Sequence, residues 1–210
     1  YNWSYSDDVI DISEEENEFV KENKIECDFY KVVYAGNIGA VQNVEIILKA
    51  AELLRREKRI RFYIIGDGLR KADHIKYVEE MGLDNVIFYP MQAPELAKHV
   101  YCMADVNVIP LKKGIIKTAL PSKTATCLAC GRPIIACVDL DSKFARMMMS
   151  SRTCSVVSSD DAQGLANKIY QYYTEDLRGQ FADEIELFRR VFSRSKNVEK
   201  YVEILREIAR

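Results

Sequence analysis

Residues 119–136, ALPSKTATCLACGRPIIA, predict a short helix followed at once by a buried strand. Pro121 suits the first helical turn, because the N–H that proline lacks would have no partner there. Gly131 is placed for a left-handed C-terminal cap, and Pro133 prevents the helix from continuing. The apolar residues that follow, 134–136, form the strand. This succession is typical of a crossover in an α/β protein.

The opening of this predicted helix is also a candidate phosphate site. The N–H groups of a first helical turn have no partner within the helix, and Ser122 and Lys123 lie beside them. An ordinary crossover helix without a ligand explains the same residues. On this stretch alone both interpretations stay open.

Outward from this stretch, strands and helices alternate from residue 31 onwards. The predicted strands are 31–36, 61–66, 85–89, 106–110, 134–136 and 153–157, and the other predicted helices are 42–58, 69–81, 94–104, 141–150 and 161–173. Six short apolar strands separated by helices predict a doubly wound, Rossmann-like parallel sheet covered on both faces. In such folds ligands bind beyond the carboxyl ends of the strands, where the strand order reverses. The turns after Ala35, Ile65, Tyr89 and Pro110 are therefore expected to form the rim of a site.

The segments on either side of this domain, 31–176, have a different character. Residues 1–30 are predicted to be a linker with a short acidic helix, which begins at a capping box of Ser13 and Glu16 and carries Phe19 and Val20 on one side. Residues 177–210 are predicted to form two helices, 177–192 and 195–210, whose apolar residues recur at helical spacing and are expected to pack in a core. Because the chain does not begin with methionine, we expect it to be a fragment of a longer protein.

Composition limits the classes of function. The chain has 210 residues, is 48% hydrophobic and carries a formal net charge of −2, which fits one globular domain and argues against nucleic-acid binding. Its six cysteines lie mostly in apolar segments, as reduced core residues of a cytosolic protein do. Cys127 and Cys130 form a C-x-x-C, but there is no second pair and only two distant histidines, so we expect neither a zinc nor a redox site.

Several short motifs in fixed order resemble a known family. They are AGNIG at 35–39, IIGDG at 64–68, NVIFYP at 85–90, ADVNVIP at 104–110, and ALPSK at 119–123 running into ACGRPIIA at 129–136. Together they resemble the C-terminal, nucleotide-sugar-binding domain of the retaining GT-B glycosyltransferases, the glycosyltransferases group 1 family. The P-S-K form is similar to the bacterial branch that builds capsule, O-antigen and exopolysaccharide chains. The resemblance covers nearly the whole chain.

This resemblance implies one half of a two-domain, cytoplasmic enzyme. Such an enzyme moves a sugar from a nucleotide, UDP before GDP, to a lipid-linked or saccharide acceptor, keeps the anomeric configuration and needs no metal. Much of its acceptor site belongs to the other, N-terminal domain. Residues 1–8 would be the linker to that domain, and the final helices would pack back toward it. The resemblance therefore implies a chain that binds a sugar nucleotide weakly and transfers nothing alone. It also leaves room for peripheral contact of the whole protein with the inner face of the plasma membrane.

The resemblance assigns roles to particular residues. Lys123 and the helix opening at Pro121 and Ser122 would neutralise the charge that develops on the leaving diphosphate. Where the family often carries an arginine and a lysine, this chain has Asn37 and Gln42, so backbone N–H groups of 37–39 and side-chain amides would have to hold the phosphates.

Two loops complete the expected donor site. Gly36 and Gly39 flank Asn37 in the first of them, although a plain turn explains all three residues. The nucleotide base would lie against Met91 and Gln92, with the main chain of Gln92 reading its edge. An ordinary β–α loop explains that segment equally well.

The largest departure from the family concerns its E-x7-E pair, in which one glutamate faces the donor sugar and the other grips the ribose. Thr118 and Thr126 occupy these positions here. An uncharged hydroxyl is a weaker partner for a diol than a carboxylate. Two alternatives therefore stay open: a non-catalytic homologue that acts as a regulatory or partner subunit, and a sugar-nucleotide epimerase of the same architecture.

Two further segments have competing interpretations. Asp139-Leu140-Asp141 imitates a metal-binding D-x-D, but it directly precedes a helix, so we expect Asp141 to cap that helix and no metal to bind. The loop 111–120 contains Lys112, Lys113 and Lys117 and could approach a phospholipid-linked acceptor or the donor phosphates. It could equally be a plain basic surface loop.

Overall fold

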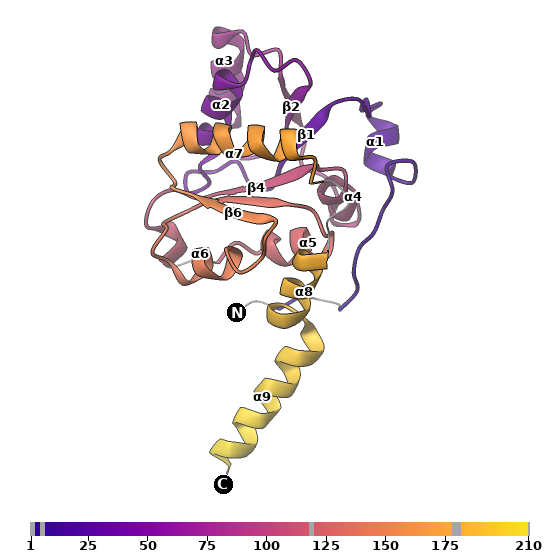
Figure 1. Ribbon diagram of the computed structural model, residues 1–210, viewed down its shortest axis with the longest axis vertical. Coiled ribbons are helices and arrows are strands. Elements are labelled where there is room, and N and C mark those ends of the chain that lie inside the picture. Colours follow the sequence, from indigo (N-terminus) through magenta and orange to yellow (C-terminus); the bar gives the residue numbers. More distant parts are fainter. Residues whose placement is uncertain (1–2, 5–6, 118–119, 178–181, 210) are drawn as a thin grey trace.

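The computed structural model describes residues 3–4, 7–117, 120–177 and 182–209. Its centre is an all-parallel sheet of six strands in the order β3-β2-β1-β4-β5-β6, shown in Figure 1. The strands are β1 (Tyr30–Ala35), β2 (Ile60–Ile65), β3 (Val86–Tyr89), β4 (Val106–Pro110), β5 (Ile134–Cys137) and β6 (Cys154–Val157). The predicted doubly wound fold is confirmed. The strand order reverses between β1 and β4, which pair directly.

Helices cover both faces of the sheet, and each face has its own apolar core. One core joins the sheet to α2 (Val44–Leu53), α3 (Lys71–Met81) and α7 (Ala162–Glu175). The other joins it to α1 (Glu18–Glu22), α4 (Ala97–Cys102), α5 (Lys123–Ala129), α6 (Lys143–Met148) and α8 (Ala182–Val191). Alternate residues of β1 and β2 point into opposite cores, because successive side chains of a strand point to opposite faces.

The left-handed cap predicted at Gly131 is confirmed, with φ +61°, and Gly82, which ends α3, has the same conformation with φ +59°. At the amino ends of helices, three positions differ from the sequence prediction. Ser13 and Glu16 hydrogen bond at 2.9 Å, yet α1 begins later, capped by the Asn17 side chain. Ser142 rather than Asp141 caps α6, since its Oγ accepts from the Ala145 N–H at 3.0 Å. Pro121 precedes α5, whose N-cap residue is Ser122.

Some predicted helices are shorter or divided. The segment 94–104 forms a 3-10 turn, η1 (Pro94–Leu96), before α4, and the helix predicted at 42–58 ends at Leu53. A second 3-10 turn, η2 (Ile115–Lys117), lies in the basic loop after β4. In none of the described segments does a helix combine the length and apolar character that crossing a bilayer requires.

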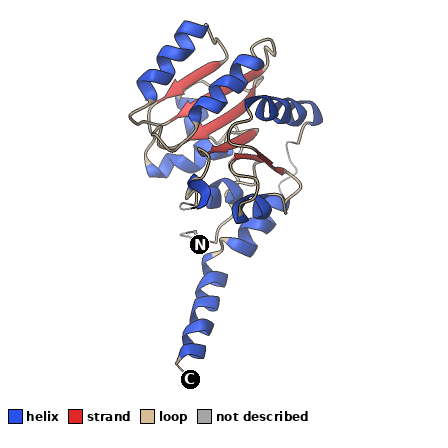
Figure 2. Cartoon of the chain, turned by 90° about the vertical axis from the view of Figure 1, so that its left-hand side faces the viewer, coloured by secondary structure: helices blue, strands red, loops and turns tan. Residues whose placement is uncertain are grey.

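The last helix, α9 (Arg194–Ile208), projects away from the rest of the molecule, as Figures 1 and 2 show. Its predicted core stripe is exposed: Val198, Val202, Leu205 and Ile208 have exposed fractions of 41%, 37%, 48% and 77%. The sequence interpretation of this stripe as core packing within the chain was therefore wrong. The stripe of α8, by contrast, buries Phe188.

Glu184, in the first turn of α8, is a fully buried carboxyl group. Its Oε1 accepts a hydrogen bond from Thr153 Oγ1, while among the described residues Oε2 has no partner. Burial raises the pKa of Glu184 from 4.5 to about 7. The native state therefore holds a proton that the unfolded state releases at lower pH.

The free energy of unfolding is consequently expected to fall as pH rises from 4.5 through about 7, by up to about 3 kcal/mol from this group. Glu184→Gln keeps the Thr153 hydrogen bond without a titrating group, so it should remove this loss and stabilise the chain above pH 7. Urea unfolding at several pH values measures both. Glu186→Gln, at an exposed position of the same helix, is the matched control. Equal pH profiles for the two variants would contradict the assignment.

Candidate functional site

The carboxyl ends of β1 and β4, where the strand order reverses, receive a lysine from α5. Lys123 Nζ donates a hydrogen bond of 2.6 Å to the carbonyl oxygen of Ala35, the last residue of β1. The same ammonium lies 4.1 Å from the centroid of the Tyr34 ring, a cation–π contact. The residue predicted to carry a positive charge therefore lies against the turn that follows the first strand.

That turn leaves room for the lysine because it contains glycine. Gly36 has φ +137°, and a Cβ there would lie 2.6 Å from Lys123 Nζ. A Cβ on Gly66, at the end of β2, would lie 1.9 Å from the Gly36 carbonyl oxygen. The two turns are also joined by a 2.7 Å hydrogen bond from the Ile38 N–H to the Asp67 carbonyl oxygen. Backbone atoms thus approach closely at this end of the sheet, as they do in folds that seat a ligand there.

Asn37 and Gln42, the two neutral residues of this turn region, contact each other. Asn37 Nδ2 donates to Gln42 Oε1 at 3.4 Å, and both amides lie within reach of Gly39, where a Cβ would be 2.8 Å and 3.0 Å from them. The Asn37 carbonyl oxygen accepts from the Tyr34 hydroxyl. The structure therefore brings Gly36, Asn37, Gly39, Gln42 and Lys123 together.

Burial dominates the electrostatics of Lys123. The surrounding chain removes water from the ammonium and lowers its pKa from 10.5 to about 8. Within the described ranges, the Lys123 ammonium contacts a carbonyl oxygen and an aromatic ring and forms no ion pair with a carboxylate, so its charge remains available to an anion. A phosphate oxygen that reached Nζ would form a charge-assisted hydrogen bond.

Two further cations flank the same turn. Lys112, which follows β4, donates its backbone N–H to the Val41 carbonyl oxygen at 3.0 Å. Lys112 and Arg70 line a small cavity with Gly39, Gln42 and Glu45, and Arg70 forms an ion pair of 2.9 Å with Asp73. Sequence reasoning named Lys112 only as one of several loop lysines and did not select Arg70. Its position in the sequence could have identified Arg70, because it follows the carboxyl end of β2.

The N-terminal turn of α5 offers fewer free polar groups to a ligand than its sequence suggests. The Pro121 carbonyl oxygen accepts from both the N–H and the hydroxyl of Thr124, at 3.2 Å and 2.8 Å. Ser122 is exposed and makes no side-chain cap bond. Thr126 is half-buried within α5, and Thr118 lies outside the described residues. The approach of Lys123 to β1, rather than the helix opening, therefore defines this site.

The predicted base-binding residues lie further along the same edge of the sheet. Met91 is half exposed, and the Gln92 side chain donates to the Pro90 carbonyl oxygen of its own loop at 2.9 Å. They follow β3, which is separated from β1 by β2. The described contacts bring neither residue to Lys123.

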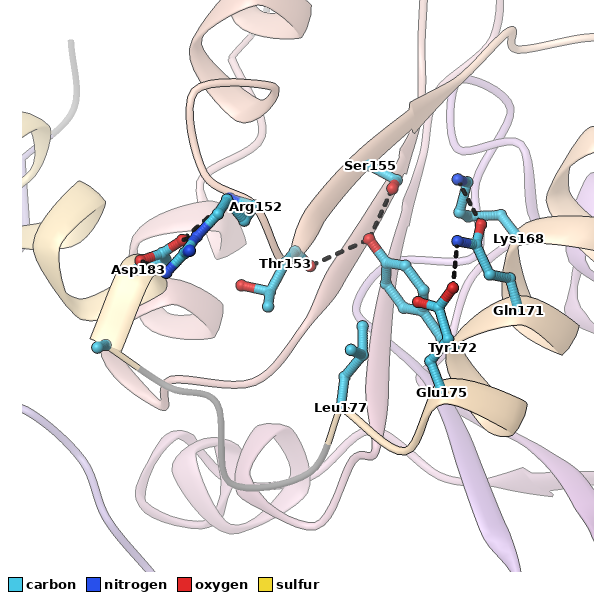
Figure 3. Close-up of a pocket in the computed structure, with 10 residues that line it drawn as sticks. Arg152, Thr153, Ser155, Lys168, Gln171, Tyr172, Glu175, Leu177 and Asp183 are labelled. Carbon is cyan, nitrogen blue, oxygen red and sulfur yellow. Dashed lines mark hydrogen bonds and ion pairs between the residues drawn. The ribbon is translucent and has the colours of Figure 1, made fainter.

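Figure 3 shows a different pocket, about 410 Å³ in volume, beside the edge strand β6. Tyr172 points into it and hydrogen bonds to Ser155 Oγ at 2.6 Å and to the Thr153 carbonyl oxygen at 3.2 Å. The ion pair of Arg152 with Asp183 closes its other side. None of the predicted site residues lines this pocket, and it lies away from the point where the strand order reverses.

Comparison with known proteins agrees with the architecture. WcaI of Escherichia coli K12, named as a colanic acid biosynthesis glycosyl transferase, is 37% identical over 100 residues, which are 48% of this chain and 24% of that protein. WbjE of Pseudomonas aeruginosa, named as a glycosyltransferase, is 24% identical over 99% of this chain and 51% of its own length. The chain therefore spans about half or less of these relatives.

A solved structure has the same fold. The crystal structure of Anabaena Alr3699/HepE in complex with UDP and glucose superposes with a TM-score of 0.77 at 14% identity, over 96% of this chain and 55% of that one. The family model described as Glycosyl transferases group 1 matches residues 30–175, from the first residue of β1 to the last of α7. This chain belongs to the glycosyltransferases group 1 family, and its fold is that of a GT-B glycosyltransferase domain.

Proposed function

We propose that this chain is the donor-binding half of a retaining glycosyltransferase and binds the diphosphate of a nucleotide sugar, UDP in the first instance, at the turn 36–39. The observation that carries the proposal is the contact of Lys123 with the end of β1 at the reversal of strand order. The complex of HepE with UDP and glucose, which shares the fold, supports the choice of nucleotide.

The residues of the turn suggest how transfer would be assisted. In a front-face displacement the departing diphosphate gains negative charge as the glycosidic bond breaks. Lys123 would donate a charge-assisted hydrogen bond to it, and Lys112 and Arg70 would add positive potential from the Gln42 side. Each contact grows stronger as the charge develops, so it lowers the barrier to transfer.

We propose that these cations, rather than a metal ion, neutralise the diphosphate. The support is the number of basic side chains around one turn: Lys123 on α5, Lys112 after β4 and Arg70 before α3. UDP affinity should then be the same in EDTA and in millimolar magnesium. A gain in affinity with magnesium would contradict this part of the proposal.

A second candidate function is supported by the E-x7-E positions. Thr126 is an uncharged, half-buried residue of α5, one turn beyond Lys123, where the family resemblance places a ribose carboxylate. A chain without that carboxylate fits a regulatory or partner subunit that has lost donor affinity.

The relatives and α9 support a proposal for the role of the whole protein. WcaI is named for colanic acid biosynthesis, which supports synthesis of a bacterial cell-surface polysaccharide such as a capsule, on a lipid-linked or saccharide acceptor in the cytoplasm or at the inner face of the membrane. The exposed apolar stripe of α9 would pack against the domain that supplies the acceptor site.

Calorimetric titration of the purified chain with UDP tests the proposal. Saturable heat, with weaker binding of GDP, supports a UDP-sugar donor site. Absence of heat together with no UDP-induced thermal shift would reject it in favour of the non-catalytic homologue. For the longer protein, release of an isomerised nucleotide sugar without transfer would identify an epimerase.

The pH dependence of UDP binding provides a separate prediction. The terminal phosphate is fully ionised above its pKa of about 6, so Lys123 dominates the change at higher pH. Between pH 7 and pH 8 the phosphate is ionised and the lysine is mostly protonated, so affinity should change little, whereas above pH 8 the lysine must take up a proton before it binds the anion. We expect affinity to fall up to about tenfold per pH unit there. A flat profile from pH 7 to 10 would contradict a direct contact.

A further inference from the structure

Lys71, the first residue of α3, joins the carboxyl ends of two neighbouring strands. Its Nζ donates a hydrogen bond of 2.8 Å to the carbonyl oxygen of Gly66, which follows β2, and one of 3.4 Å to that of Tyr89, the last residue of β3. The Gly66 N–H donates to the same Tyr89 oxygen at 3.1 Å. Most lysines extend into water, whereas Lys71 is half-buried and directs its ammonium at two main-chain oxygens.

The loop that contains these groups, 66–71, is joined on its other side to the turn 36–39. The Ile38 N–H donates to the Asp67 carbonyl oxygen at 2.7 Å, and the Ile38 carbonyl oxygen accepts from the Arg70 N–H at 3.0 Å. Two hydrogen bonds to one residue fix both the separation and the orientation of the two main-chain segments. The loop 66–71 therefore links the proposed diphosphate site to the end of β3.

The segment 90–92 begins directly after the oxygen that Lys71 binds. Its first residue, Pro90, has no N–H with which to hold the segment in place. The Gln92 side chain donates to the Pro90 carbonyl oxygen at 2.9 Å, which shapes the segment internally. Met91 presents an exposed apolar side chain beside this contact. The position of the segment therefore depends on how firmly the end of β3 is held.

The spacing of the strands relates this segment to a nucleotide bound at the turn 36–39. The strands follow one another in the order β3-β2-β1, and neighbouring strands lie about 4.8 Å apart, so the end of β3 is about 10 Å from the end of β1. That distance is on the scale of a ribose and its base. A nucleotide with its diphosphate on the turn can therefore extend along the edge of the sheet until its base meets Met91.

We propose that Lys71 is a positioning residue that makes the donor site selective for the base of the nucleotide. By binding the Tyr89 carbonyl oxygen it fixes the segment 90–92, so the polar groups of that segment keep one arrangement toward the base. A fixed segment can match a pyrimidine and exclude the larger purine, whereas a loosely held one adapts to either. The inference rests on the proposed function, because it requires a nucleotide on the turn 36–39.

The ratio of the dissociation constants of GDP and UDP, measured by calorimetry, tests this role. Both ligands carry the same diphosphate, so the loss of a positive charge or a general loss of stability weakens both alike and leaves the ratio unchanged. Lys71→Met is expected to lower the ratio of GDP to UDP by about fivefold or more, a part of the 10- to 100-fold for one hydrogen bond to a charged group. Lys71→Arg, which keeps a charged donor, should retain most of the selectivity.

Lys76→Met is the matched control, because it removes an exposed lysine from the same helix, and it should leave the ratio unchanged. Thermal unfolding must show that Lys71→Met remains folded. If it does not, Lys71→Gln, which keeps a neutral donor, replaces it in the same comparison. In the amide spectrum of the unaltered chain, Met91 and Gln92 should shift with UDP and not with inorganic pyrophosphate.

The outcomes separate this inference from the proposed function. A Lys71 variant with the same ratio as the unaltered chain would overturn the inference and leave the diphosphate site intact. Equal affinities of the unaltered chain for GDP and UDP, or no shift of Met91 and Gln92 at saturating UDP, would overturn it as well. If the unaltered chain binds neither nucleotide, the proposed function itself is rejected.

Discussion

Lys123→Met is expected to weaken UDP binding by about 10- to 100-fold, the range for losing one hydrogen bond to a charged group. Methionine keeps the length and apolar stem of the side chain but has no ammonium. It can still pack on the Tyr34 ring, while the partner offered to the diphosphate beside Ala35 is lost. In this variant the affinity for UDP should also no longer fall above pH 8, because the group that titrates there is absent.

Calorimetry on matched variants separates this effect from a general change in charge. Lys143→Met removes one exposed lysine from α6 and should leave UDP affinity within about twofold, since an exposed charge is screened by salt. Thermal unfolding must show that Lys123→Met remains folded. Equal affinities for the two variants would exclude Lys123 from the donor site.

Gly66→Ala is expected to have the largest effect on stability, a loss of more than about 3 kcal/mol. The added Cβ would lie 1.9 Å from the Gly36 carbonyl oxygen, a backbone atom that cannot rotate away. Gly66 cannot retreat either, since its N–H is bound to the Tyr89 carbonyl oxygen at 3.1 Å. The turns that follow β1 and β2 must therefore separate, which would also disturb the turn 36–39.

Gly82→Ala is the matched control for this substitution. Gly82 has φ +59°, but its Cβ would meet no atom within 4 Å, so the expected cost is only the conformational strain of about 1 to 2 kcal/mol. Urea unfolding of both variants measures the difference. A Gly66→Ala variant no less stable than Gly82→Ala would show that the two turns are not packed as closely as described.

Local patterns in the sequence were sufficient for the fold. Apolar runs of strand length, separated by amphipathic segments, predicted all six strands, and the glycine at 131 predicted where a helix ends. These signals are local, because a strand or a left-handed cap needs only its own neighbours in sequence. Helix starts were harder, since Ser13, Asp141 and Ser142 all offer oxygens and only the folded geometry selects Asn17 and Ser142 as caps.

The candidate site depends on contacts between distant parts of the chain. Lys123 could be selected from its place beside a proline, but its partner, the Ala35 carbonyl oxygen, is 88 residues away and follows from the pairing of β1 with β4. The same limit explains why Arg70 was missed. For α9, periodicity indicated an apolar side but not what covers it.

The amide spectrum of ¹⁵N-labelled chain during titration with UDP tests the central claim most directly. If the diphosphate binds at the reversal of strand order, the amide signals of Gly36, Asn37, Gly39 and Lys123 should shift together and saturate with one dissociation constant. Shifts confined to the pocket beside β6, around Ser155 and Tyr172, or the absence of any shift at millimolar UDP, would contradict it.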